Sequence, residues 1–189
     1  MTVLNNIAIL YSRDKKQDKA EEYFTKAYEL AGKVNNNISK GLYAINLTIV
    51  SNEKKDYKTA KKYIDEALKL TVDSPYYLLA KSTYVETLVN LKQFDEAEKI
   101  STELLPKLNG VEHSEYKTQI FYNLSTIAEQ KNDLQKSFHY LKLAEASNLN
   151  YDFKENIFEK VSNLYKNREQ YWARRFLQRF HYGHQRFCE

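Results

Sequence analysis

The chain has 189 residues, enough for a sizeable hydrophobic core, and its length predicts one or two domains. Four Gly and two Pro leave little material for hairpins or phosphate-binding loops, which favours helices. The single Cys, Cys188, excludes an intrachain disulfide. No apolar run reaches the roughly 18 residues that a membrane span needs, and no secretory signal is visible. We therefore expect a cytoplasmic protein that does not enter a membrane.

Two helical patterns alternate along the chain. The first is an apolar stripe, seen in Leu4, Ile7, Ala8 and Tyr11; Ala44, Leu47 and Thr48; Phe121, Leu124, Ser125 and Ala128; and Phe158, Val161, Ser162 and Tyr165. The second opens on a small residue, as in Ala20, Phe24 and Ala27; Ala60, Ile64 and Ala67; Ala97, Ser101 and Leu104; and Ser137, Leu141 and Ala144. These small residues are 40, 37 and 40 residues apart, which predicts repeated helix pairs.

Short polar segments separate the helices. Lys recurs where the first helix of a pair ends, and a cation there suits the helix dipole. Asn132 is predicted to take the left-handed conformation that often ends a helix. Between the second and third pairs, we expect Ser74 to be an N-cap and Pro75 the first helical residue.

The C-terminal segment 173–189 departs from the pattern. Arg174 stands where a small residue is expected, and Arg replaces Lys throughout the segment. Three interpretations stay open: a polar cap on the last repeat, a basic helix that binds an acidic partner, membrane surface or nucleic acid, or an abnormal end of the chain. A metal site is not predicted, because a fourth ligand is missing beside His181, His184 and Cys188.

Over roughly residues 2–172, the repeated pairs resemble the tetratricopeptide repeat family. The matching features are the small, aromatic and Ala positions of the second helix, and the sequences NIA, NLT and NLS that begin at Asn6, Asn46 and Asn123. The period is longer than the family's, which is about 34 residues, and the Pro that usually closes a unit is missing. The resemblance implies an all-α fold, a right-handed α-solenoid superhelix of about five stacked antiparallel helix pairs. We expect a repeat array over 1–172, with units near 2–35, 36–73, 74–111, 112–149 and 150–182, and a separate segment 173–189.

In similar repeat proteins the first helices line a concave groove, and an Asn just before the core Leu or Ile hydrogen-bonds the backbone of a bound peptide. Asn6, Asn46 and Asn123 occupy that place here, and an amide can both donate and accept. Neighbouring positions of the same helices complete the expected partner-binding groove with Asn5, Asn52, Asn90, Gln119, Tyr122 and Asn163. The alternative is that these Asn side chains are solvated or bond their own helix.

The chain contains 16 Tyr, a number that could suggest an aromatic binding surface. Most of them fall on the apolar stripes or at their margins, where the ring is buried and the hydroxyl reaches the surface. We therefore predict core packing for Tyr11, Tyr23, Tyr63, Tyr84 and Tyr165.

Nothing in the sequence predicts catalysis, because the four His are dispersed and no nucleophile is paired with one of them. We expect no catalytic residue, cofactor or metal, and a protein or peptide as the partner. The predicted function is a protein-protein or peptide interaction module. An alternative is the sensory or regulatory part of a transcription regulator or signalling protein, and nucleic-acid binding through the C-terminal segment is less favoured. A homodimer through an uncapped N-terminal end is also expected, since nothing precedes the stripe of Leu4, Ile7 and Tyr11.

Overall fold

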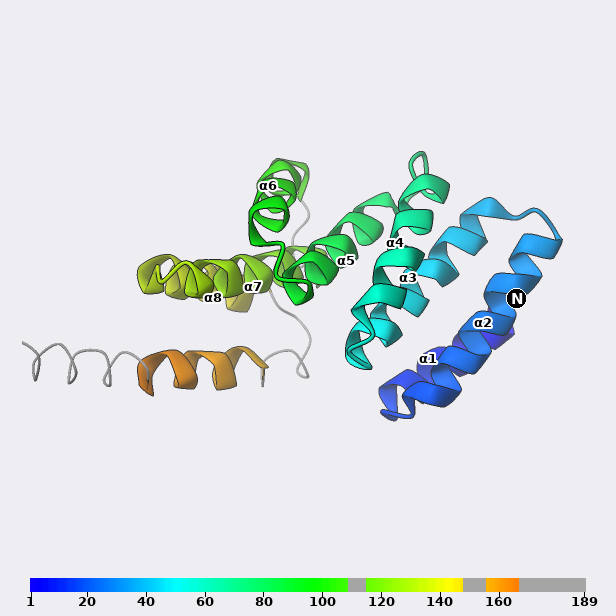
Figure 1. Cartoon of the computed structure of the whole chain (residues 1–189), viewed down its shortest axis with the longest axis horizontal. Coiled ribbons are helices and arrows are strands. Elements are labelled where there is room, and N and C mark those ends of the chain that lie inside the picture. Colours follow the sequence, from blue (N-terminus) through cyan, green and yellow to red (C-terminus); the bar gives the residue numbers. More distant parts are fainter. Residues whose placement is uncertain (109–114, 148–155, 167–189) are drawn as a thin grey trace, which may run out of the picture.

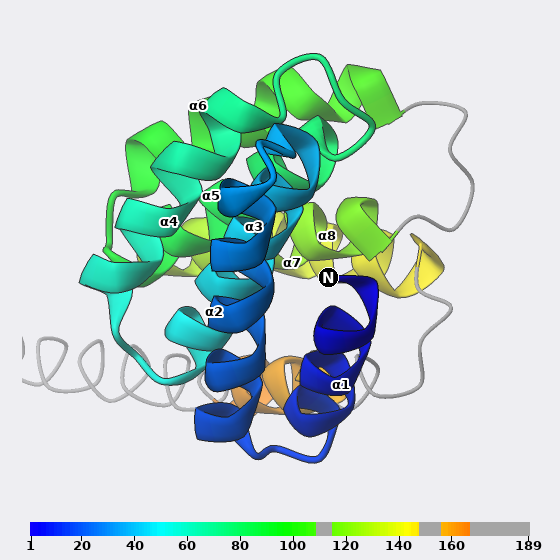
Figure 2. The ribbon, with the colours of Figure 1, turned by 90° about the vertical axis from the view of Figure 1, so that its right-hand side faces the viewer.

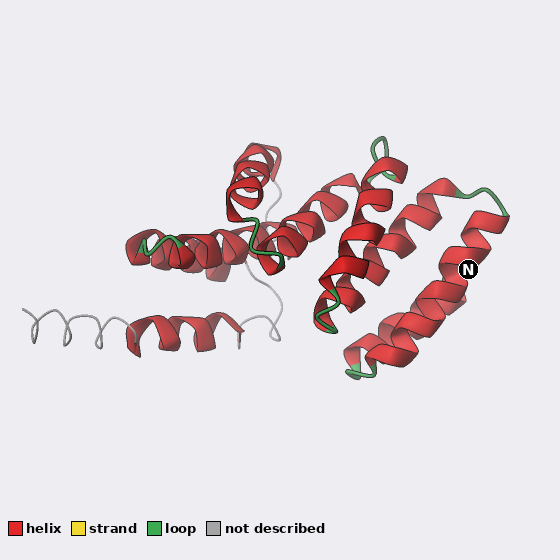
Figure 3. Ribbon diagram, viewed as in Figure 1, coloured by secondary structure: helices red, strands yellow, loops and turns green. Residues whose placement is uncertain are grey.

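The computed structural model describes residues 1–108, 115–147 and 156–166. Within these ranges the chain forms helices and short turns and contains no β-strand (Figures 1 and 3). The helices are α1 (Thr2–Arg13), α2 (Gln17–Lys33), α3 (Asn37–Glu53), α4 (Tyr57–Leu70), α5 (Tyr77–Asn90), α6 (Phe94–Leu104), the 3₁₀ helix η1 (Leu105–Leu108), α7 (Glu115–Gln130) and α8 (Leu134–Ser147). Residues 156–166 form a further helical segment, drawn in orange in Figure 1.

Consecutive helices pack as pairs, and each pair packs on the next. The pairs are α1 with α2, α3 with α4, α5 with α6 and α7 with α8, and α2, α4 and α6 also contact the first helix of the following pair. First helices contact one another directly, α3 with α5 and α5 with α7. Figure 2 looks along this array with α1 and α2 in front. The protein is therefore an all-α repeat solenoid, which confirms the predicted fold class.

The small-residue pattern of the second helices forms the core of every pair. All twelve of its residues are buried, with at most 3% of their surface exposed. The first helix also places a fully buried, mostly small residue at the contact, such as Ala8 opposite the helix that carries Ala20. In the fourth pair the contact is a hydrogen bond of 2.9 Å between the hydroxyls of Ser125 and Ser137. Small side chains let the two backbones approach, and larger ones fill the space beside them.

The predicted stripe of the fifth copy is wrong at Phe158 and Tyr165, although Val161 packs against the core. Phe158 is 64% exposed and Tyr165 is 54% exposed, whereas Ile157 and Leu164 are buried in the core with α7 and α8. In the other copies this stripe packs on the second helix of its own pair, and no such helix follows within the described residues. Tyr165 is therefore not a core residue, although its ring lies 5.0 Å from that of Phe138. The four other Tyr side chains predicted to pack in the core are partly buried.

Each turn inside a pair contains one residue in the left-handed conformation. These residues are Lys15, Lys55, Lys92 and Asn132, with φ between 57° and 62°. The following N–H donates back to a carbonyl five residues earlier, as from Asp56 to Ser51 at 2.9 Å, which closes the end of the helix. The prediction for Asn132 is confirmed. The recurring Lys residues occupy the same backbone position, a role that their charge alone did not indicate.

The predicted start of α5 is wrong by two residues. The helix begins at Tyr77, and its N-cap residue is Tyr76. The Ser74 hydroxyl instead accepts a hydrogen bond of 3.2 Å from the Tyr76 N–H, which closes the turn that leads into the helix. Pro75 lies in this turn, ahead of the first helical residue.

Two lysines join neighbouring pairs through matching ion pairs. Nζ of Lys54, at the end of α3, lies 2.8 Å from Asp18 and 2.6 Å from Glu21 of α2. Lys131, just after α7, repeats this arrangement with two carboxylates of α6, at 2.8 and 2.6 Å. The hydrogen bonds to these carboxylates raise the pKa of Lys131 to about 12. These ion pairs lie at the surface, so they orient the helices more than they stabilise the fold.

Replacing Lys55 by Gly should stabilise the protein. A side chain at positive φ costs about 1 to 2 kcal/mol, and Gly removes this cost while losing about 0.5 to 1 kcal/mol of chain entropy. The control is Lys62→Gly in the exposed interior of α4, which should lower the free energy of unfolding by about 1 kcal/mol. Thermal melting followed by circular dichroism measures both, and equal destabilisation by both variants would contradict the assigned turn.

Replacing Gly41 by Ala should destabilise the contact between α3 and the end of α4. A Cβ at this position would lie 2.6 Å from Cγ2 of Thr71, whose buried hydroxyl is held by the carbonyl of Ala67. We expect a loss of about 1 to 3 kcal/mol through overpacking. The same change at Gly32 meets only the flexible Lys40 side chain at 3.7 Å, so it should not destabilise. Urea unfolding distinguishes the two, and a Gly41→Ala variant as stable as the parent would refute the close packing.

Candidate functional site

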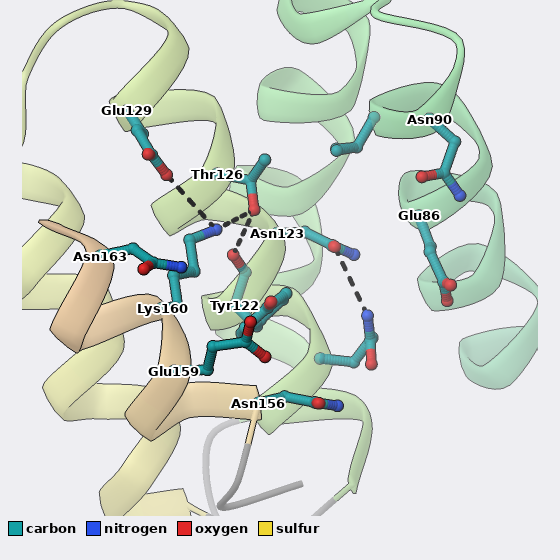
Figure 4. Close-up of a pocket in the computed structure, with 12 residues that line it drawn as sticks. Glu86, Asn90, Tyr122, Asn123, Thr126, Glu129, Asn156, Glu159, Lys160 and Asn163 are labelled. Carbon is teal, nitrogen blue, oxygen red and sulfur yellow. Dashed lines mark hydrogen bonds and ion pairs between the residues drawn. The ribbon is translucent and has the colours of Figure 1, made fainter.

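A cavity of about 460 Å³ lies between α5, α7 and the segment 156–166 (Figure 4). Helices α5 and α7 are the first helices of successive pairs, so the cavity faces the side on which the sequence predicted a groove. Most of the residues that line it are polar: Glu86, Val89, Asn90, Gln119, Tyr122, Asn123, Thr126, Glu129, Asn156, Glu159, Lys160 and Asn163.

The structure brings five of the nine predicted site residues together in this cavity, namely Asn90, Gln119, Tyr122, Asn123 and Asn163. The other four lie elsewhere along the first helices. Nδ2 of Asn46 donates to Oδ1 of Asn5 at 2.8 Å, which links α3 to α1. Asn5 in turn donates to the exposed Asn6 at 3.4 Å. Nδ2 of Asn52 donates to the Thr87 hydroxyl at 3.1 Å, which links α3 to α5.

Asn123 is the most buried of the amides in the cavity, with 3% of its surface exposed. Its Oδ1 accepts a hydrogen bond of 3.4 Å from Nε2 of Gln119, one turn earlier on α7. Its Nδ2 has no hydrogen-bond partner in the described part of the chain. A buried donor without a partner costs about 1 to 3 kcal/mol. The cavity wall thus holds a donor that an acceptor from outside the chain could satisfy.

Lys160 contributes the cation of the cavity lining. Its Nζ donates to the Thr126 hydroxyl, lies 3.8 Å from Oε2 of Glu129 and sits 4.4 Å from the centre of the Tyr122 ring. Only 11% of the side chain is exposed, and burial lowers the pKa of Lys160 to about 8. Lys160 therefore fastens the segment 156–166 to α7 and neutralises Glu129.

Glu86 is a partly buried carboxylate on the α5 side of the cavity. Burial, with a smaller contribution from the Glu53 carboxylate, raises the pKa of Glu86 to about 7. Burial also raises the pKa of Glu53, at the end of α3. Neither carboxylate forms an ion pair with another described residue. The lining has three carboxylates and one ammonium group, so the cavity is acidic.

Sequence reasoning missed Glu86 and Lys160. Lys160 follows Asn123 by 37 residues, the shorter of the two intervals of the repeat, so it occupies the place of the predicted Asn in the fifth copy. In the third copy the corresponding place, 40 residues before Asn123, is Thr83, and Glu86 lies about one helical turn after it. The repeat thus contained a signal for Lys160 but none for Glu86, and charged residues on a helix usually indicate a solvated face.

The other predicted sites are not tested by the structure. The candidate metal ligands His181, His184 and Cys188, like all of 173–189, lie outside the described residues. Among those that the structure describes, no cluster of His, Cys, Asp and Glu could hold a metal ion. No described helix is long and apolar enough to cross a bilayer. On α1, Val3 is 70% exposed and Leu10 is 62% exposed, and the predicted homodimer through this end stays a prediction.

Comparisons with known proteins agree with the helical repeat. Residues 2–33 match the family model of the tetratricopeptide repeat. The crystal structure of BtubC (BKLC) from P. vanneervenii, a helical repeat protein, is similar with a TM-score of 0.62 and 18% identity. The match covers 77% of this chain and 62% of BtubC, so the chain spans less than two thirds of that protein. No curated protein matches the sequence. Residues 2–33, which include α1 and α2, are thus similar to a tetratricopeptide repeat, and the described chain has the all-α repeat fold that the resemblance predicted.

Proposed function

We propose that the protein binds an extended segment of a partner protein in the cavity between α5, α7 and 156–166. Tetratricopeptide repeats are protein-protein interaction modules in general. The observation that supports this particular cavity is the unpaired Nδ2 of Asn123, a buried donor in its wall. A backbone carbonyl of the partner would accept from it.

The amides around Asn123 suit a peptide backbone better than a catalytic reaction. Asn90, Gln119 and Asn163 each carry both a donor and an acceptor, and backbone groups of any sequence offer both. The Tyr122 ring gives this polar lining an apolar surface. Binding without catalysis, by a cytoplasmic protein, is therefore the proposal.

The four predicted residues outside the cavity take another role in this proposal. The side chains of Asn5, Asn46 and Asn52 form hydrogen bonds between the first helices of successive pairs, so they position the groove. Asn6 is exposed on α1 and accepts from Asn5. The regulatory alternative stays a prediction, as does nucleic-acid binding through 173–189, which lies outside the described residues.

Replacing Asn123 by Ala should weaken peptide binding without destabilising the fold. The probe is a phage-displayed library of random 12-residue peptides, selected on the intact protein, and the best peptides are then synthesised for fluorescence polarisation. Loss of one buried hydrogen bond should weaken binding about 3- to 10-fold. The melting temperature should change little, because the substitution removes a buried donor that is already unpaired and only one long hydrogen bond, the 3.4 Å bond from Gln119.

The matched control is Asn37→Ala, at an exposed position of α3 outside the cavity, which should bind the same peptides as the parent does. Failure to select any peptide, or selected peptides that bind Asn123→Ala and the parent equally, would refute the proposed site.

A further inference from the structure

We infer that the segment bound in this cavity places a Lys or Arg side chain against Glu86. The inference rests on the proposed function and names the chemistry of the partner: an extended peptide with a basic residue. Three observations support it: the uncompensated charge of Glu86, the unpaired donor of Asn123 and the contacts by which the cavity holds the ammonium group of Lys160.

The charges of the cavity are unequally satisfied. Glu129 has Lys160 at 3.8 Å, and Glu159 lies exposed on the segment 156–166, where water solvates it. Glu86 is partly buried and forms no ion pair with a described residue, and its charged neighbour on α3 is the carboxylate of Glu53. Burying a carboxylate is costly unless a cation or hydrogen bonds compensate. A basic side chain from outside would supply that compensation.

Asn123 lies beside the acidic groups, so the cavity can bind the backbone of a peptide as well as a basic side chain. In Figure 4, Glu86 and Asn90 project from α5, Lys160 lies on the opposite side of the cavity, and Asn123 lies between them. The unpaired Nδ2 of Asn123 can hold a backbone carbonyl while the side chain of the same segment reaches Glu86.

Lys160 shows how this lining holds a cation. Its ammonium group donates to the hydroxyl of Thr126, lies near the carboxylate of Glu129 and faces the ring of Tyr122. These groups are occupied by Lys160. The carboxylate on the α5 side remains for a cation of the partner.

The selection experiment described above tests this inference with the same random-peptide library. We expect peptides selected at pH 7.5 on the parent protein to carry Lys or Arg at one preferred position. Replacing that residue by Met should weaken binding about 10-fold or more, and Glu86→Gln should weaken binding of the parent peptide by a similar factor. The Met peptide should bind Glu86→Gln at least as tightly as the parent protein, because only the parent then buries a carboxylate without a cation.

Two controls separate this effect from general electrostatics and from misfolding. Glu103→Gln, at an exposed position of α6 outside the cavity, removes the same charge and should leave binding within about twofold of the parent. Glu86→Gln should melt at or above the parent's temperature at pH 7.5, since it removes a poorly solvated carboxylate. Two outcomes would overturn the inference and leave the proposed site standing. In the first, the selected peptides depend on Asn123 but show no preference for Lys or Arg. In the second, peptides with Lys or Arg bind Glu86→Gln as tightly as they bind the parent protein.

Binding of the basic peptides should tighten about four- to eightfold from pH 6.0 to pH 7.5, the larger factor if the protonated form of Glu86 hardly binds them. The carboxylate of Glu86 ionises over this range, because its pKa in the free protein is about 7, and the ionised form attracts the cation. The charged and titratable groups that face it are Glu53 from α3, Tyr122 and Glu129 from α7, and Glu159 and Lys160 from 156–166.

Lys160 remains mostly protonated up to pH 7.5, because its pKa is about 8, so Glu86 dominates the change. Titration with peptides that lack His measures the effect by fluorescence polarisation. Glu86→Gln should abolish most of the pH dependence, and an equal dependence in that variant would show that another group is responsible.

Discussion

The architecture depends on how closely the two helices of each pair can approach. At this contact both helices carry residues that are fully buried, such as Ala8 and Ala20, or Ser125 and Ser137. A long side chain at any of these places would push the backbones apart, because protein interiors are too densely packed to absorb added volume. The second helices therefore hold the first helices at a regular spacing. The cavity between α5, α7 and 156–166 exists because of that spacing.

The sequence predicted the fold well for a physical reason. The same residue types recur at the buried positions of each helix pair, so the pattern is seen several times along the chain. Such a recurrence is not expected by chance. The same reasoning failed where the pattern had no neighbour to pack on, at Phe158 and Tyr165. It also failed at Ser74, because the side chain capped a turn and not the helix behind it. The unit boundaries and the handedness of the superhelix stay predictions.

The candidate site could be predicted only in part. Amide side chains recur at the same place in three copies, which drew attention to Asn123, but the sequence did not show that Asn46 would bond Asn5 instead of a ligand. Glu86 and Lys160 were not recognised, because a charged residue on a helix has the same pattern whether it faces water or a cavity. The difference is one of burial, which depends on how three helices from separate repeats come together. The spacing of residues in a single sequence does not show how three helices pack together, so it could not predict this burial.

The contacts between successive helix pairs differ in whether a lysine ion pair is present. Lys54 ties the second pair to the first, and Lys131 ties the fourth to the third, but the residue that follows α5 at the corresponding place is Leu91. Salt weakens the attraction between exposed charges, whereas apolar contacts do not weaken in this way. High ionic strength thus weakens the ion pairs between the first and second helix pairs and between the third and fourth, whereas no ion pair among the described residues joins the second pair to the third. The contacts between successive helix pairs therefore respond unequally to salt.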